Sequence, residues 1–214
     1  WLLRLRADYR TGAGEITTID LPDGSRMQMN SQTAVMLDFE HGRRAVRLIE
    51  GEAFFEVVHD TSHPFTVTGG YGTVRVTGTA FDVARDADAD VVHLQSGRVM
   101  LTQDGAVSPP VVMMPGQTAT VALARISFLP QDDGESRLAW REGWIELSAV
   151  PLRKALDEIG RHTDLSILTL PGAALETPVS GNFRIAEAEA AIDSVATAAG
   201  ARIERLPGGV LFIH

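Results

Sequence analysis

The feature that most constrains this chain is a long series of short runs in which apolar and polar residues alternate, from Ile16 to about Ala124. The runs are rich in Val, Phe and Thr, and a period of two is typical of half-buried β-strands. Turn residues separate them at Asp23-Gly24, His41-Gly42, Gly69-Gly70, Ser96-Gly97 and Asp104-Gly105. Strands at intervals of about eight to twelve residues predict an all-β sandwich, roll or solenoid, and the sequence leaves these three open.

The alternation also sets the expected strand boundaries. Strands are predicted at 16–21, 26–29, 34–39, 45–50, 53–58, 65–68, 72–77, 80–84, 91–95, 98–102, 111–114 and 117–122. Gly51 falls between two of these runs, so we expect a turn there.

The periodicity changes after a polar segment, Gln131–Glu135, which we interpret as a linker. Pro151 fits a first helical position, and apolar residues recur at helical spacing as far as Arg161. A second helix is predicted over 185–199, with Gly200 as its C-terminal stop. Further strands are predicted at 144–147, 165–168, 179–183, 202–206 and 210–213. The resulting order, βαββαββ, predicts a small α/β sandwich of about 70 residues.

The chain is therefore expected to be mainly β plus α/β, with an all-β domain over 9–130 and an α/β domain over 140–214. A net charge of −9 and the lack of a basic cluster argue against nucleic-acid binding. The chain has no cysteine, which excludes disulfides and thiolate metal sites. No run approaches the ~20 apolar residues of a membrane span. Because it starts at Trp1, we expect it to be an excised piece of a longer protein.

Several clusters could suggest catalytic or metal sites, and each is better explained by a structural role. His59 and His63 flank Asp60 in an expected loop, but a zinc site needs three or four ligands on fixed elements. The carboxylates Glu50, Glu52 and Glu56 surround an expected turn rather than a glycosidase site. The run 69–72 lacks the strand-to-helix context of a phosphate loop, so a flexible hairpin is predicted. We therefore expect no enzyme activity on other molecules, no cofactor and no metal.

Six short phrases follow one another along the chain: Leu21-Pro22-Asp23-Gly24-Ser25, Gly51-Glu52-Ala53-Phe54-Phe55, Pro64-Phe65, Gly78-Thr79-Ala80-Phe81, Pro115-Gly116-Gln117 and Ala139-Trp140-Arg141-Glu142-Gly143. Taken in this order, they resemble the FecR family of periplasmic sensors that control sigma factors. Residues 8–15 resemble the family's first phrase beyond the membrane, so the resemblance covers about 9–214. The second half is similar to the STN module, through matching residues in 151–156, 179–183 and 189–192.

The resemblance implies a location and a set of partners. The chain would be the periplasmic signalling region of a protein anchored in the inner membrane by one upstream helix. Its partner would be the periplasmic signalling domain of an outer-membrane TonB-dependent transporter carrying siderophore or haem. An upstream cytoplasmic segment would control an extracytoplasmic-function sigma factor, with release through periplasmic and intramembrane proteases.

Two sets of residues are candidates for these functions. Some sensors of this family cut themselves at the Gly-Thr phrase, so Gly78 and Thr79 are the candidate self-cleavage pair, the Thr hydroxyl attacking the preceding carbonyl. The terminal strand Val210, Leu211, Phe212 and Ile213 is the candidate sheet edge for partner binding, with the first helix of the α/β half as the other option. The alternative function is an envelope carbohydrate-binding β module or a remnant hydrolase, which the 6% aromatic content does not favour.

Overall fold

The structure is a computed structural model that describes residues 6–105, 109–130 and 134–214 of the 214-residue chain. The opening Trp1-Leu2-Leu3 lies outside the described residues. Contacts divide the chain into two compact units, one of Trp1–Gly12 with Ile16–Gly134 and the other of Ala13–Glu15 with Glu135–His214. Each unit is described by itself.

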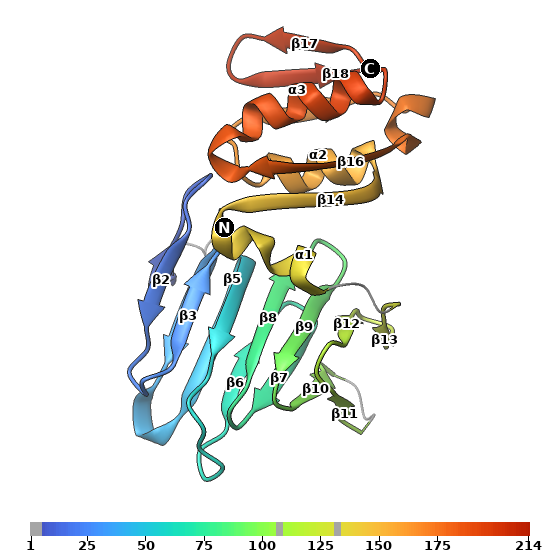
Figure 1. Ribbon diagram of the computed structural model, residues 1–214. Coiled ribbons are helices and arrows are strands. Elements are labelled where there is room, and N and C mark those ends of the chain that lie inside the picture. Colours follow the sequence, from blue (N-terminus) through green and yellow to red (C-terminus); the bar gives the residue numbers. More distant parts are fainter. Residues whose placement is uncertain (1–5, 106–108, 131–133) are drawn as a thin grey trace. The chain divides into compact units, whose positions relative to one another are not determined.

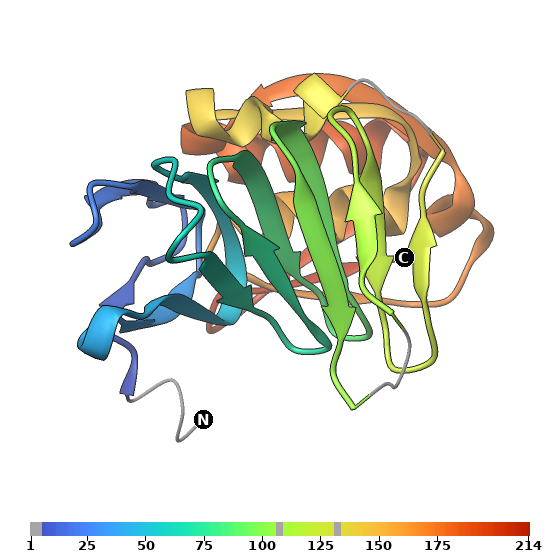
Figure 2. The same ribbon diagram turned by 90° about the horizontal axis from the view of Figure 1, so that it is seen from below.

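The N-terminal unit is one thirteen-stranded sheet that folds over on itself (Figures 1 and 2). Its strands are β1 (Tyr9–Arg10), β2 (Thr17–Asp20), β3 (Arg26–Met29), β4 (Ala34–Asp38), β5 (Arg44–Glu56), β6 (Phe65–Thr68), β7 (Gly72–Val76), β8 (Ala80–Arg85), β9 (Asp90–Ser96), β10 (Val99–Gln103), β11 (Val111–Met113), β12 (Thr118–Val121) and β13 (Ile126–Phe128). The main order is β11-β10-β7-β6-β5-β8-β9-β12-β13. Of the sandwich, roll and solenoid that the sequence leaves open, the roll describes this sheet best, and the roll is nearly closed.

The prediction of a turn at Gly51 is wrong, because β5 runs unbroken through this residue. The first part of β5 pairs with β4 and, in parallel, with β6, whereas its last part pairs with β3 and β8. Gly51 has a φ of +81°, and the pairing of β5 with β4 shifts register just before it, because Ala34 pairs with Glu50 and Val35 with Leu48. A glycine here lets the strand bend from one side of the roll to the other without ending.

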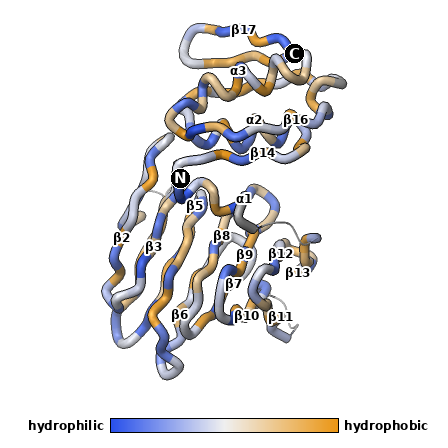
Figure 3. Tube along the Cα trace, in the orientation of Figure 1, coloured by the Kyte–Doolittle hydropathy of each residue, from blue (hydrophilic) through white to orange (hydrophobic). Residues whose placement is uncertain are grey.

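The core lies inside the roll and comes from the inward-facing residues of both sides. Phe55 of β5 stacks on Phe81 of β8 at 5.2 Å between ring centroids, and its ring lies 5.9 Å from that of Phe65. All three are fully buried. Hydrophobic and hydrophilic residues alternate along these strands in Figure 3, as the period of two predicts.

The C-terminal unit has the predicted order of elements from β14 onward. Its helices and strands are α1 (Gly134–Leu138), β14 (Trp144–Pro151), α2 (Leu152–Gly160), β15 (Ser166–Thr169), β16 (Pro178–Arg184), α3 (Ala188–Ala198), β17 (Ile203–Leu206) and β18 (Val210–Ile213). β14 pairs with β16, and β15, β18 and β17 form a second sheet. The buried faces of α2 and α3 carry Leu152, Leu156, Ile192 and Val195, four of the positions whose helical spacing predicted these helices.

Some boundaries differ from the prediction. Gly134 begins α1, so the linker interpretation of 131–135 is wrong at its C-terminal end, and 131–133 lie outside the described residues. The helix predicted from residue 185 begins at Ala188, because a 3₁₀ turn over Ile185–Glu187 comes first. In the part of the chain that the structure describes, no helix is long and apolar enough to cross a membrane.

Candidate functional site

The Gly78–Thr79 pair lies where the chain passes from β7 to β8. Gly78 has a φ of +153°, which side-chain-bearing residues rarely adopt, and Thr79 is 5% exposed. A Cβ built on Gly78 would lie 2.9 Å from the Cα of His59, so this position has no room for a side chain. The structure therefore gives two independent reasons for glycine before Thr79.

Neighbouring backbone holds both sides of this peptide. The Val57 amide donates to the Thr79 carbonyl at 3.0 Å, and the Asp60 amide donates to the Thr77 carbonyl at 2.8 Å. The Thr79 hydroxyl donates to the Arg98 carbonyl at 3.1 Å. A Cβ on Gly97 would lie 2.8 Å from the Gly78 carbonyl oxygen and 3.0 Å from Thr79 Oγ1. Three chain segments thus meet tightly around the pair, and a hydrogen bond to the Arg98 carbonyl holds the Thr79 hydroxyl.

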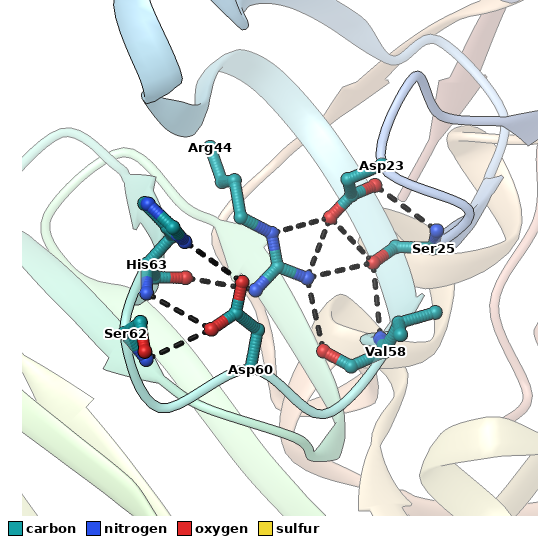
Figure 4. Close-up of polar contacts among 7 residues, drawn as sticks. All are labelled: Asp23, Ser25, Arg44, Val58, Asp60, Ser62 and His63. Carbon is teal, nitrogen blue, oxygen red and sulfur yellow. Dashed lines mark hydrogen bonds and ion pairs between the residues drawn. The ribbon is translucent and has the colours of Figure 1, made fainter.

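The loop after β5, residues 57–64, is held in turn by Arg44 (Figure 4). The guanidinium of Arg44 donates to the carbonyls of Val58 at 2.9 Å and His63 at 2.8 Å. It also donates from Nε to Asp23 Oδ2 at 2.7 Å. The Val58 amide donates to Ser25 Oγ at 3.0 Å. Through Arg44, the turn at 21–25 therefore fixes the loop that touches Gly78.

Arg44 was not predicted from the sequence, although it lies at the start of the strand that leads into Gly51-Glu52-Ala53-Phe54-Phe55. Its side chain is 8% exposed. A buried arginine is a signal of a polar network, but burial of an arginine cannot be read from alternation alone. The network explains physically why the phrases at 21–25, 64–65 and 78–81 occur together, since they meet in one region of the roll.

Two carboxylates of this region have lowered pKa values. Burial raises the pKa of Asp23, but hydrogen bonds from the hydroxyl and amide of Ser25 and from Arg44 outweigh it, so the net pKa falls below 3.8. The pKa of Asp60 falls to about 2, because the His63 side chain, the His63 amide and the Ser62 amide donate to it. Both carboxylates therefore stay ionised at neutral pH.

The other candidate clusters have structural roles. Glu52 is 9% exposed and accepts a hydrogen bond from Asn30 Nδ2 at 2.7 Å, so it is occupied within the fold. Asp60 and His63 contact each other at 2.9 Å in an exposed loop, as interpreted from the sequence. Among the residues that the structure describes, no group of three or more potential ligands could hold a metal ion.

The predicted flexibility of the Gly69–Gly72 hairpin is wrong, because the side chain of Asp90 holds this turn. The buried carboxylate accepts hydrogen bonds from the amides of Gly70 at 2.8 Å, Tyr71 at 2.7 Å and Gly72 at 3.1 Å. A glycine-rich turn can offer such amides to a phosphate. Here the protein's own carboxylate fills that position.

The prediction that Val210–Ile213 forms a sheet edge is wrong. β18 pairs with β15 on one side and β17 on the other, so it is the middle strand and has no free edge for strand addition. Leu211 and Ile213 are buried, while Val210 and Phe212 point to the opposite face and are partly exposed. The sequence placed β18 correctly, but its pairing partners depend on tertiary contacts.

The outer face of this three-stranded sheet carries exposed apolar residues. Leu168 of β15 is opposite Phe212, and Leu206 of β17 is opposite Val210. Leu168 is 52% exposed and Leu206 is 46% exposed. Paired positions share a face of a sheet, so these four side chains form one apolar surface, which we call the outer sheet face. The exposed aromatic residues Tyr9, Phe128 and Trp144 lie on three different strands, an arrangement that does not favour a carbohydrate platform.

Comparison with known proteins supports one of the resemblances. Residues 7–100 match the family model of the FecR protein, so the match ends before the phrases at 115–117 and 139–143. Two crystal structures of a "putative anti-sigma factor" from Parabacteroides distasonis have TM-scores of 0.81 and 0.80 with this chain. Both are 23% identical to it, and each comparison covers 96% of this chain and 97% of the other. That likeness shows a shared fold. No curated protein matches the chain.

Proposed function

We propose, from the premise that residues 7–100 of this chain belong to the FecR family, that the chain is the sensor region of a sigma-factor regulator. The family match is the observation that carries this proposal. A fold shared over nearly the whole chain with a protein described as an anti-sigma factor agrees with it. In this role the chain works in the periplasm, and an upstream segment anchored in the inner membrane acts on the sigma factor.

The signal would come from an outer-membrane TonB-dependent transporter loaded with siderophore or haem. We assign its docking to the outer sheet face of the C-terminal unit. Exposed Leu168 and Leu206 supply the apolar area on which such contacts depend. The same proposal holds that this unit is an STN module, which the element order β14-α2-β15-β16-α3-β17-β18 supports.

Binding to the periplasmic signalling domains of transporters from the same host tests this assignment. The full chain should capture one of them, and Leu168→Asp or Leu206→Asp should weaken binding about tenfold or more. Leu123→Asp is the matched control, because Leu123 is 82% exposed and lies in the N-terminal unit. Equal affinity of all three variants and wild type would move the docking site elsewhere, with α2 as the next candidate. Capture of no signalling domain would contradict the proposed partner.

Self-cleavage at Gly78–Thr79 is the second part of the proposal. Two observations support it: Gly78 has a backbone conformation that favours glycine, and the Thr79 hydroxyl is held by a hydrogen bond. Thr79→Ser should still cut, whereas Thr79→Ala should leave one chain, as judged by denaturing mass spectrometry. The pieces should stay together in native buffer, because Ala80–Arg85 pairs with Gly51–Glu56 across the break. If wild type stays intact on prolonged incubation, Gly78 has a structural role only and release depends on external proteases.

A further inference from the structure

His59 lies directly against Gly78. A Cβ placed on Gly78 would be 2.5 Å from His59 Nδ1 and 2.9 Å from both its Cα and Cβ. Since a Cα–C bond is about 1.5 Å long, His59 Nδ1 lies within about 4 Å of the Gly78 Cα.

The backbone fixes this contact from both sides. Val57 and Asp60 donate their amides to the carbonyls of Thr79 and Thr77, so His59 lies opposite Gly78 across a short backbone pairing. Arg44 holds the Val58 carbonyl next to it. The imidazole itself is exposed, so a water molecule can reach it. The Thr79 hydroxyl, by contrast, donates its hydrogen bond to a backbone carbonyl, which is too weak a base to take its proton.

We propose that His59 is the proton-transfer residue of cleavage at Gly78–Thr79, an inference that rests on the self-cleavage proposed above. Thr79 Oγ1 forms a bond to the Gly78 carbonyl carbon, and the imidazole takes the hydroxyl proton directly or through one water. The bond from that carbon to the Thr79 nitrogen then breaks, and the imidazolium returns the proton to the nitrogen, which becomes a free amine. Water next adds to the ester carbon and the bond to Oγ1 breaks. The products are a Gly78 carboxylic acid and a chain that begins at Thr79 with its hydroxyl restored.

The test follows cleavage of the freshly synthesised full chain by denaturing gel and mass spectrometry over time. His59→Ala should slow cleavage about a hundredfold, within the range usual for acid–base groups. Free imidazole should restore part of that rate, because the side chain is exposed and its removal leaves room. His59→Gln should stay slow. The matched control is His41→Ala, since His41 is also exposed but lies between β4 and β5, and it should cut at the wild-type rate.

Each outcome decides between the two proposals. If His59→Ala cuts as fast as wild type while Thr79→Ala stays intact, self-cleavage stands and the role of His59 is refuted. If His59→Ala is slow, imidazole does not help and the melting temperature falls, His59 holds the loop rather than moving protons. If wild type never cuts, self-cleavage and this inference fail together.

Discussion

Arg44 and Asp23 form a buried ion pair, with Arg44 Nη2 2.6 Å from Asp23 Oδ2 and side chains only 8% and 11% exposed. Removing one partner of such a pair leaves an uncompensated charge, so Arg44→Met should lower the free energy of unfolding by about 3–5 kcal/mol. The adjacent Arg43 pairs with Asp38 at 2.9 Å, but those side chains are 56% and 47% exposed. Arg43→Met should therefore cost about 1 kcal/mol or less in urea denaturation. Equal losses for both variants would contradict a structural role for Arg44.

The lowered pKa of Asp23 predicts how this contribution varies with pH. A group whose pKa is lower in the folded state stabilises the fold above its unfolded pKa and loses that effect as pH falls through the folded value. The difference in unfolding free energy between wild type and Asp23→Asn should thus be largest near neutral pH and shrink below 3.8. Urea titrations from pH 7 down to pH 2.5 measure it. A difference that stays constant over this range would show that the Asp23 charge contributes nothing.

Gly51 should tolerate alanine far less well than another glycine with similar backbone angles. A Cβ on Gly51 would lie 2.6 Å from the Cα of Thr33, whereas a Cβ on Gly42 meets nothing within 4 Å. Their φ angles are +81° and +76°, so both variants pay about 1–2 kcal/mol of backbone strain. Gly51→Ala should lower the free energy of unfolding by roughly 1–3 kcal/mol more than Gly42→Ala does, because of overpacking. Thermal melts of the two variants side by side measure this extra loss, and indistinguishable melts would mean that the backbone at Thr33 shifts without cost.

Asp90 should be required to order the Gly69–Gly72 turn. Asp90→Ala removes the acceptor for three amides, and hydrogen bonds to a charged group each contribute about 1.5–3 kcal/mol. Amide hydrogen exchange at 70–72 should accelerate strongly, and overall stability should fall by several kcal/mol. Asp88→Ala is the control, because Asp88 is exposed on the loop just before β9. Unchanged exchange at Gly70 in Asp90→Ala would show that the turn is ordered without the carboxylate.

The C-terminal unit should fold by itself, and its start can be located by truncation. Leu138 and Trp140 are 9% and 3% exposed, so α1 and the residues after it contribute buried side chains. A fragment over 134–214 should unfold cooperatively. Its free energy of unfolding should exceed that of a fragment over 140–214 by about 1.5–3 kcal/mol, the effect of burying one large side chain. Circular dichroism during heating compares the two. Failure of both fragments to fold would show that this unit depends on the rest of the chain.

The fold was predictable wherever local chemistry determines it. Alternation placed most strands from β2 to β12, and apolar spacing located α2 and α3, because each buries one face. β1 and β13 were not predicted, since strands of two and three residues carry too little pattern to detect. Gly51 was misinterpreted because a glycine that bends a strand and one that ends a strand look the same in sequence.

The candidate site was predictable in part. The Gly78–Thr79 pair was named from the resemblance, and self-cleavage there stays a prediction. The structure adds that Gly78 has a backbone conformation that favours glycine. Arg44 and Asp90 were missed because only tertiary folding brings them close to their partners, which are the Asp23 side chain and backbone groups for Arg44 and backbone amides for Asp90. The position of β18 within its sheet was missed for the same reason, since β15 reaches it from more than 40 residues away in parallel pairing.

Because β5 hydrogen-bonds to β3, β4, β6 and β8, the loss of this one strand removes a partner from four others at once. No half of the roll can persist while the other melts, since both halves include part of the same thirteen residues. A force or a protease that opens the N-terminal unit therefore meets a single all-or-none barrier instead of a sequence of small ones. Such a unit stays folded under mild perturbation and unfolds completely once β5 separates from its neighbours, so it responds to force as a two-state switch.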